Sequence, residues 1–370
     1  MDREEAPGPD LRNAGIYVHF PFCRRACFYC HFFKKSFRPA TAADYLKRLA
    51  MEARLRRDVA LSADSVYIGG GSPSLLAAGQ ISMLLEILAG HFALASRAEV
   101  TLEANPEDVF PPRLRELRRA GINRLSIGVQ SFAERDLRCL KRTHDAARAI
   151  QAVAMARAAG FANVSVDLII GLPTQTKKGL EGNFRMIEEI KPAHVSVYIL
   201  ENVPSKRPPL GGGPRPADDA RDARLYFQAR QALLDLGFKH YEVSNFCRPG
   251  KASRHNLKYW RNEPYVGLGA SAAGYLDGRD YRNVSNLKKY GDAVRSGKLP
   301  VIRTRQMAPE KRRIITGLRL LDGIPSSSFA SFPTETNFLL REGFLVRRNR
   351  NIAVPPEKIL LLNEILGYFI

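Results

Sequence analysis

The sequence lacks the features that mark secreted and membrane proteins. It has only five cysteines in 370 residues, an odd number, and only one tryptophan. So few cysteines are not typical of a small secreted domain held by disulfides. No apolar run reaches the roughly 20 residues of a membrane-spanning helix, and residues 1–6 are polar, unlike a signal peptide. These absences predict a cytoplasmic protein, whose reduced thiols are available as metal ligands.

Acidic residues are scarce relative to basic ones. The chain has 57 Lys and Arg against 37 Asp and Glu, a formal net charge of +20. Such a field attracts anions in general, including nucleic acid, phosphorylated ligands, the propionates of tetrapyrroles and a membrane surface. The basic residues are scattered through predicted helices, which favours ordinary solvated helix faces. We therefore expect no nucleic-acid partner, and leave peripheral contact with an anionic membrane open.

The length and the hydrophobic content of 45% predict one large domain with a smaller one. Apolar β-type runs alternate with helical stretches six times, which predicts parallel strands joined by right-handed crossovers. The strands are expected at 15–20, 65–68, 99–103, 124–129, 164–170 and 194–200, and the helices at 41–58, 81–88, 112–120, 146–159, 177–190 and 217–236. Six such units predict an α/β fold in the form of an incomplete (β/α)6 barrel, which resembles part of a TIM barrel. In such barrels the active residues lie at the carboxyl ends of the strands.

The character of the chain changes near residue 300. A helix is expected near 309–321, a hairpin from 344–347 and 352–354, and a helix at 356–368. This pattern is typical of a small α+β module of the winged-helix type. Residues 204–216, rich in proline and glycine, predict an exposed loop. The expected division is a tail at 1–14, the barrel at 15–240, a connecting segment at 241–300 and the C-terminal domain at 301–370.

Three cysteines lie within eight residues of one another. Cys23, Cys27 and Cys30 have the spacing C-x3-C-x2-C. Three thiolates can hold three irons of a [4Fe–4S] cluster and leave the fourth iron open for chemistry. A structural zinc site would need a fourth ligand, and His31 adjoins Cys30 too closely to join the other three. The spacing therefore favours a cluster over a zinc site or a disulfide.

This spacing resembles the signature of the radical S-adenosylmethionine (SAM) family. The resemblance implies that the amino and carboxylate groups of SAM chelate the open iron, and that an electron from the cluster cleaves SAM to a deoxyadenosyl radical. It also implies the partial (β/α)6 barrel that the strand–helix repeat predicts.

Polar residues and glycines follow several of the predicted strands. The run 69–74 begins with three glycines, which allow a ligand to approach the backbone closely. Glu103, Gln130 and Asp167 lie at or near strand ends, and Arg142 could pair with a carboxylate of a ligand. Each feature alone is also compatible with a turn or a helix cap.

Together these residues resemble the SAM pocket of the oxygen-independent coproporphyrinogen III oxidase-like family. The resemblance implies SAM contacts from Tyr17, Tyr29, Gly70, Gly71, Ser72, Glu103, Gln130, Arg142 and Asp167.

The stretch from His255 to Trp260 has the pattern H-N-x-x-Y-W. An imidazole can ligate haem iron, and tyrosine and tryptophan offer flat apolar faces to a macrocycle. The residues alone are also compatible with a buried structural cluster in which His255 bonds to a carbonyl. The pattern resembles the motif of the HemW family of haem chaperones. That resemblance implies haem binding by His255, Asn256, Tyr259 and Trp260.

Residues 15–368 carry the resemblance. Three features separate the chain from the oxygen-independent coproporphyrinogen III dehydrogenase, the enzyme of the same family. Phe32 occupies the position of a further cysteine, only 22 residues precede Cys23, and the dehydrogenase lacks the H-N-x-x-Y-W motif. One departure from the HemW pattern is Ala273, where such chains usually carry a histidine. If that histidine helps to hold haem in related chains, haem binding by this chain is expected to be weaker or altered.

The resemblance implies a haem chaperone that binds a [4Fe–4S] cluster, SAM and haem. Its partner would be a haem-accepting protein such as a respiratory one. The first alternative is radical decarboxylation of the propionates of coproporphyrinogen III. The second is a radical SAM enzyme that modifies RNA, but no basic strip with interleaved aromatic residues of the kind that binds single strands is visible.

Overall fold

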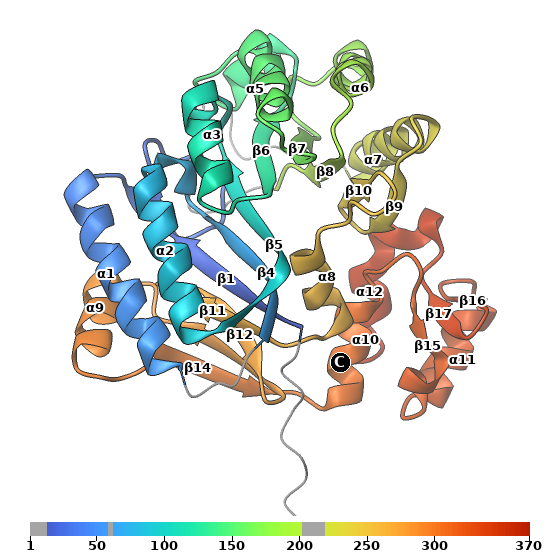
Figure 1. The fold of residues 1–370 in the computed structure, drawn as a ribbon. Coiled ribbons are helices and arrows are strands. Elements are labelled where there is room, and N and C mark those ends of the chain that lie inside the picture. The colour runs from blue at the N-terminus through green and yellow to red at the C-terminus, as the bar shows by residue number, and fades with distance from the viewer. Residues whose placement is uncertain (1–12, 58–61, 202–218) are drawn as a thin grey trace, which may run out of the picture.

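Six parallel strands form the middle of a twelve-stranded sheet (Figure 1). The computed structural model describes residues 13–57, 62–201 and 219–370, and the sheet is counted over these ranges. The six strands are neighbours in chain order, which confirms the predicted repeat. They are β1 (Ala14–Phe20), β4 (Ser62–Gly70), β5 (Ala93–Ala104), β6 (Arg124–Gln130), β7 (Asn163–Ile170) and β8 (His194–Ile199).

A helix follows each of these strands, and the helices form an arc around the outside of the sheet (Figure 1). The side chain of Asp145 caps one of them and that of Thr176 another, by accepting the N–H of Arg148 and Gly179 at 2.7 and 3.1 Å. A six-residue helix, α4 (Glu134–Cys139), is too short for its apolar period to be visible in the sequence. The helices of the arc are α1 (Pro39–Leu55), α2 (Ala78–His91), α3 (Pro111–Arg119), α5 (Ala146–Ala158), α6 (Lys177–Ile190) and α7 (Asp219–Asp235).

The two faces of the parallel strands differ in chemistry. Because side chains alternate along a strand, Leu125 and Ile127 of β6 pack outward into the main hydrophobic core, whereas Arg124 and Ser126 point inward. The other strands show the same alternation. The inner face is therefore polar, and the hydrophobic core lies between the sheet and the arc of helices.

The sheet extends beyond the six predicted strands on both sides. β11 (Tyr265–Leu268) pairs in parallel with β1, and antiparallel strands continue from β11 and from β8. These extra strands have three to six residues each, so tertiary pairing rather than local pattern defines them. They are β12 (Ala273–Leu276), β13 (Arg279–Asn283) and β14 (Val301–Gln306) on one side, and β10 (Asn245–Cys247) and β9 (Lys239–Glu242) on the other.

Two helices of the connecting segment support the barrel from different sides. α8 (Arg254–Arg261) packs against β1 and β4 and also against α10 (Pro309–Gly317), and α9 (Leu287–Arg295) packs against α1. Since β14 pairs with β13, the first residues of the predicted C-terminal domain belong to the main sheet. The other predicted boundaries remain predictions.

The C-terminal elements combine helices with a small three-stranded sheet in the order β15–β17–β16. The predicted hairpin is present, and the last helix begins as a 3-10 helix at Pro356–Leu361. The comparison with a winged helix remains a prediction. The elements are β15 (Ile324–Pro325), α11 (Pro333–Arg341), β16 (Val346–Arg348), β17 (Asn351–Ala353) and α12 (Leu362–Gly367).

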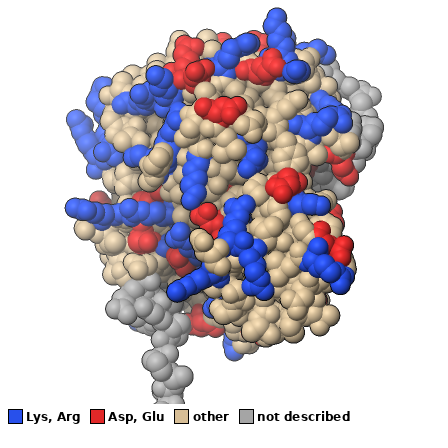
Figure 2. Space-filling model, turned by 90° about the vertical axis from the view of Figure 1, so that its right-hand side faces the viewer, with Lys and Arg blue, Asp and Glu red and all other residues tan. Residues whose placement is uncertain are grey.

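The predicted loop at 204–216 and most of the predicted tail at 1–14 lie outside the described residues. Within the described ranges, no helix is both long enough and apolar enough to cross a bilayer. Figure 2 shows Lys and Arg spread over the face that carries α7 and the C-terminal elements, with acidic residues among them. On this face the positive charge therefore does not form one continuous patch.

A buried carboxylate joins α1 to the extension of the sheet. Glu52 is fully buried and accepts hydrogen bonds from Asn283, the backbone N–H of Gly269 and the hydroxyl of Tyr290, at 2.7, 2.7 and 2.9 Å. It also pairs with the buried Arg56 at 3.2 Å. These contacts fix the β11–β13 region against the first helix.

Removing this carboxylate should destabilise the fold. We expect Glu52→Ala to lower the free energy of unfolding by about 3–5 kcal/mol, because it leaves the Arg56 charge buried without its partner. Denaturant titration measures this change. The exposed helical Glu86 provides the control, since Glu86→Ala should change stability by no more than about 0.5 kcal/mol. Similar stabilities for the two variants would contradict the assignment.

Candidate functional site

A cavity of about 670 Å³ opens at the carboxyl ends of the parallel strands. Its walls come from the cysteine loop after β1 and from the ends of β4 to β8. This is the end of a parallel barrel at which active sites are built, because loops from several strands converge there. The cavity is therefore the candidate cofactor site.

The cysteine loop is anchored at both of its ends. Short strands β2 (Phe22–Cys23) and β3 (Lys35–Ser36) pair in parallel, and the N–H of Phe37 donates to the carbonyl of Cys23 at 2.9 Å. All three cysteines of the motif line the cavity. Burial raises the pKa of the Cys23 thiol, so a bound cation would be needed to favour its thiolate.

The cysteines fit a cluster better than a single metal ion. Among the described residues, no three His, Cys, Asp or Glu side chains converge on the position of one ion. A [4Fe–4S] cube instead takes each thiolate on a different iron. Cys27, Cys30 and Cys23 all line one cavity, so this donor set fits the cluster that the sequence predicts.

The glycine turn after β4 lies directly against the cysteine loop. A Cβ on Gly71 would come within 2.7 Å of the carbonyl oxygens of Phe20 and Phe22. The N–H groups of Gly71 and Ser72 donate to those same carbonyls, at 2.7 and 2.9 Å. The N–H groups of the turn are thus engaged within the protein, and its carbonyl oxygens are the groups suited to an amino group of a ligand.

Glu103 and Asp167 point into the polar floor of the cavity. Glu103 accepts hydrogen bonds at 2.9 Å from both the Tyr67 hydroxyl and the N–H of Gly70. Burial raises the pKa of Glu103 to about 7, and the charge of Asp167 adds to this effect. Asp167 accepts from the Ser126 hydroxyl at 3.1 Å, and burial raises its pKa too. Both carboxyl groups thus line the cavity, and burial favours their protonated forms more than water would.

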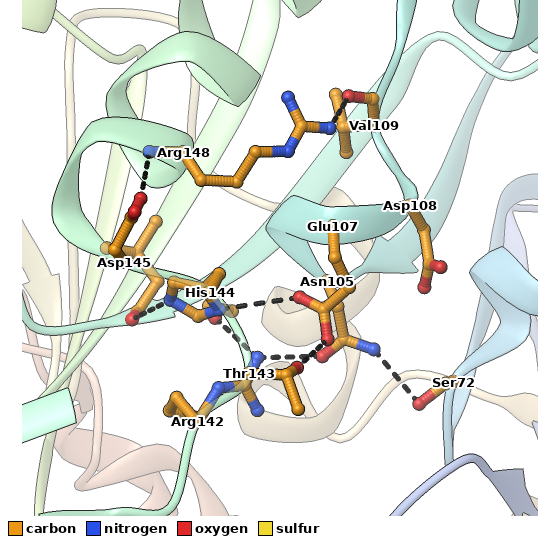
Figure 3. A network of polar contacts seen from close by, with 12 residues as sticks. Ser72, Asn105, Glu107, Asp108, Val109, Arg142, Thr143, His144, Asp145 and Arg148 are labelled. Carbon is orange, nitrogen blue, oxygen red and sulfur yellow. Dashed lines mark hydrogen bonds and ion pairs between the residues drawn. The ribbon is translucent and has the colours of Figure 1, made fainter. Parts of the chain in front are cut away.

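Arg142 lies at the centre of a polar network (Figure 3). Its Nη2 donates to Asn105 Oδ1 at 2.8 Å and to the Gly128 carbonyl at 3.0 Å. Its Nη1 lies 3.9 Å from Cys27 Sγ, and Asn105 Nδ2 donates to Ser72 Oγ at 3.1 Å. The guanidinium thus stands between the cysteine loop and the glycine turn, where a ligand carboxylate would meet it.

Glu107 fixes the loop that carries Arg142 (Figure 3). It accepts a hydrogen bond from Thr143 Oγ1 at 2.6 Å and lies 3.4 Å from His144 Nδ1. Burial opposes ionisation, but the contacts with His144 and Thr143 outweigh it and lower the pKa of Glu107 to about 2. Glu107 therefore stays ionised and holds the loop in place.

Eight of the nine predicted SAM residues line the cavity. Gln130 does so with a φ of 72°, a left-handed conformation that is uncommon outside glycine and favours a functional position. Tyr29 lines it beside Arg142, at 3.5 Å. Tyr17 is absent from the lining over the described residues, and its hydroxyl lies 2.9 Å from His19 Nδ1. The others that line the cavity are Gly70, Gly71, Ser72, Glu103, Arg142 and Asp167.

The predicted haem motif lies at the opposite end of the barrel. His255 is fully buried, with Nδ1 3.1 Å from Ser65 Oγ and Nε2 2.8 Å from the Tyr259 hydroxyl. Its ring stacks on Tyr67, with centroids 5.4 Å apart. Burial lowers the pKa of His255 to about 3. Both ring nitrogens are thus engaged within the protein, by hydroxyl groups rather than by a carbonyl.

The other residues of the motif belong to the same region. Tyr259 and Trp260 are half-buried with ring centroids 6.3 Å apart, and Arg319 lies over the Trp260 ring at 5.3 Å. The backbone N–H of Asn256 donates to the helix-capping Ser253 at 3.3 Å. No residue of the motif lines the described cavity. A haem role for this motif remains a prediction.

Three contributors to the site did not emerge from the sequence. Tyr67, Asn105 and Ser126 hold Glu103, Arg142 and Asp167 respectively. Asn105 had a usable signal, since it lies two residues after the end of a predicted strand. Tyr67 and Ser126 lie inside strands, where only the inward alternation of the barrel marks them as site residues.

The comparisons with known proteins agree with the cysteine loop and the barrel. The model of the radical SAM superfamily matches residues 17–187. The solved structure of coproporphyrinogen III oxidase (HemN) from Escherichia coli, a radical SAM enzyme, superposes with a TM-score of 0.83 at 25% identity, covering 97% of this chain and 90% of that one. The fold and the site thus define a radical SAM protein.

Similar proteins of named function show to which family within the radical SAM superfamily the chain belongs. Haem chaperone HemW of Bacillus subtilis is 31% identical over 96% of this chain and 98% of its own length. HemW of Mycobacterium tuberculosis is 34% identical over 90% and 88%, and that of E. coli K12 is 37% identical over 74% and 73%. The chain belongs to the HemW family.

Loss of one loop cysteine should prevent cluster assembly. We expect serine substitution of Cys23, Cys27 or Cys30 to remove most of the iron and sulfide bound after anaerobic reconstitution, because the fourth iron already lacks a protein ligand. Cys139→Ala, at a buried cysteine in α4 away from the cavity, should retain them. Full iron content in any loop variant would contradict this ligand set.

Proposed function

We propose that this chain is a cytoplasmic haem chaperone that binds a [4Fe–4S] cluster, SAM and haem and transfers the haem to an acceptor protein. One observation carries the proposal. The three-cysteine loop and the polar residues that the sequence predicts for SAM line a single cavity, in a chain related over nearly its whole length to haem chaperones.

Each part of the cavity would bind a different part of the cluster or of SAM. Cys23, Cys27 and Cys30 hold the cluster, and Arg142 neutralises a ligand carboxylate. The carbonyls of the glycine turn accept from an amino group, and Glu103 accepts from ribose hydroxyls. When bound, the cluster supplies an open iron and an electron. Tyr17 lies outside the lining, with its ring centroid 6.2 Å from that of Tyr67, and would support the site through Tyr67.

Binding of haem by the H-N-x-x-Y-W motif would require a local opening. His255 would have to give up its contacts with Ser65 and Tyr259 and leave a fully buried position beneath α8, which packs against β1 and β4. A buried side chain of this kind does not meet a macrocycle without movement of α8. Transfer to a respiratory haem protein, and contact with an anionic membrane surface through the net charge of +20, are the finer parts of this proposal.

The fold of HemN supports a second candidate. In that function the chain would oxidatively decarboxylate coproporphyrinogen III, and the cavity would admit a propionate next to SAM. Anaerobic incubation of the reconstituted protein with SAM, a reductant and coproporphyrinogen III separates the two functions. Formation of protoporphyrinogen would favour the enzyme over the chaperone.

The pKa of Glu103 should make SAM binding depend on pH. The carboxyl group is protonated below about pH 7, and the ribose hydroxyls need an ionised acceptor. Between about pH 8 and about pH 6, the Kd for SAM should therefore rise about tenfold, one factor of ten per pH unit below the pKa. Calorimetric titration measures it. Glu103→Gln should bind more weakly with little pH dependence, and an unchanged slope in this variant would contradict the role of Glu103.

Haem binding and transfer provide the direct test. Anaerobic titration of the cluster-loaded protein should give saturable one-to-one binding at micromolar haem. The rate of transfer to an apo-cytochrome of the respiratory chain should rise with acceptor concentration, whereas transfer to apomyoglobin should follow spontaneous dissociation. Absence of saturable binding would contradict the chaperone function. Equal, concentration-independent rates for both acceptors would contradict directed transfer.

A further inference from the structure

The cavity has a second wall that the predicted SAM contacts leave unused. It is formed by Ile169, Ile199 and Leu200 at the ends of β7 and β8, together with two large aromatic side chains. These are Tyr198, 44% exposed, and Phe32, 59% exposed. Large apolar surface that faces a cavity is typical of a ligand site. This wall suits a flat apolar ligand rather than the polar groups of SAM.

His31 lies at the mouth of the same cavity, next to Phe32. Its side chain is 51% exposed, and its Nε2 lies 3.3 Å from Glu201 Oε2. If Nε2–H donates to that carboxylate, the lone pair of the imidazole is on Nδ1, for which the described residues show no hydrogen-bond partner. A histidine that donates one ring N–H to a carboxylate while the other nitrogen binds a metal is the usual arrangement of metal-ligating histidines.

Two cations stand on the rim of the cavity. Arg25 and Lys141 are exposed and line it, and Arg25 Nη1 donates to the Lys141 carbonyl at 3.5 Å. The guanidinium of Arg25 therefore lies against the backbone of Lys141, and both residues belong to the same part of the rim. Such a pair suits a ligand that carries two carboxylates on one edge.

We propose that haem binds across the mouth of this cavity, with His31 Nδ1 as an axial ligand of its iron. Phe32 and Tyr198 contact the macrocycle, and Arg25 and Lys141 pair with its two propionates. The inference deepens the proposed haem-chaperone function and rests on it. It places haem beside the cluster and SAM, at the end of the barrel opposite to His255.

The same loop also has the pattern of covalent haem attachment. Cys27, Cys30 and His31 fit C-x-x-C-H, in which two thiols bond to the macrocycle and the histidine binds the iron. Covalent attachment would consume two of the three cluster ligands. In the proposed binding only the histidine of the pattern acts toward haem.

The first experiment compares histidine variants of the cluster-loaded protein. Haem titration with visible spectroscopy should show that His31→Ala binds about tenfold more weakly or worse and loses the spectrum of the ligated iron. Added imidazole should restore that spectrum. Iron and sulfide content should match the unchanged protein, which excludes a folding defect. His91→Ala, in α2 outside the cavity, is the control and should behave like the unchanged protein.

The second experiment tests whether the two cations on the rim bind the propionates of haem. The unchanged protein should bind haem about tenfold more tightly than haem dimethyl ester, which lacks both carboxylates. The double variant R25Q and K141Q should bind the two ligands equally. Phe32→Ala should weaken both to the same extent, because it removes apolar contact only.

The outcomes distinguish the proposed haem site at the cavity mouth from the proposed haem-chaperone function. No haem binding by the unchanged protein would overturn both. Haem binding that survives His31→Ala with its spectrum intact, but is lost in His255→Gln, would overturn the mouth site and leave the chaperone function standing.

Discussion

The alternation of side chains along six parallel strands is the constraint on which the rest of the structure depends. Outward residues such as Leu125 and Ile127 pack under the helices, so their neighbours Arg124 and Ser126 must face the inside of the barrel. A polar interior is stable only when its groups find partners. The contacts of Glu103, Asp167 and Arg142 meet this requirement and at the same time shape the cavity.

The polar interior is open to ligands at one end of the barrel and closed by protein contacts at the other. At the carboxyl ends, the cysteine loop, the glycine turn and Arg142 leave about 670 Å³ open to ligands. At the amino ends, α8 closes the barrel, and His255 and Tyr259 satisfy each other and Ser65. Tyr67 connects the two ends, since it stacks on His255 and donates to Glu103. The H-N-x-x-Y-W motif thus supports the floor of the cofactor site.

Charged side chains inside the protein are paired with partners that lie close by. The buried carboxylate of Glu52 and the half-buried one of Glu107 are each matched by nearby donors, and these contacts fix segments that are distant in sequence. Exposed cations such as Arg25 and Lys141 lie at the cavity mouth, where an anionic ligand would meet them. On the face drawn in Figure 2, basic side chains are interspersed with acidic ones.

The sequence by itself determined the six strand–helix units, which follow from local period, and parallel strands bring their carboxyl ends together whatever the details of packing. The residues expected to hold the cluster and SAM came from the cysteine spacing and from the resemblance to a known family, and all but Tyr17 line one cavity. Only the tertiary structure decided that β11 to β14 extend the sheet, that Tyr17 lies outside the cavity lining and that His255 is buried. Short strands and the exposure of a single aromatic or histidine side chain depend on partners far away in the chain, which no local pattern records.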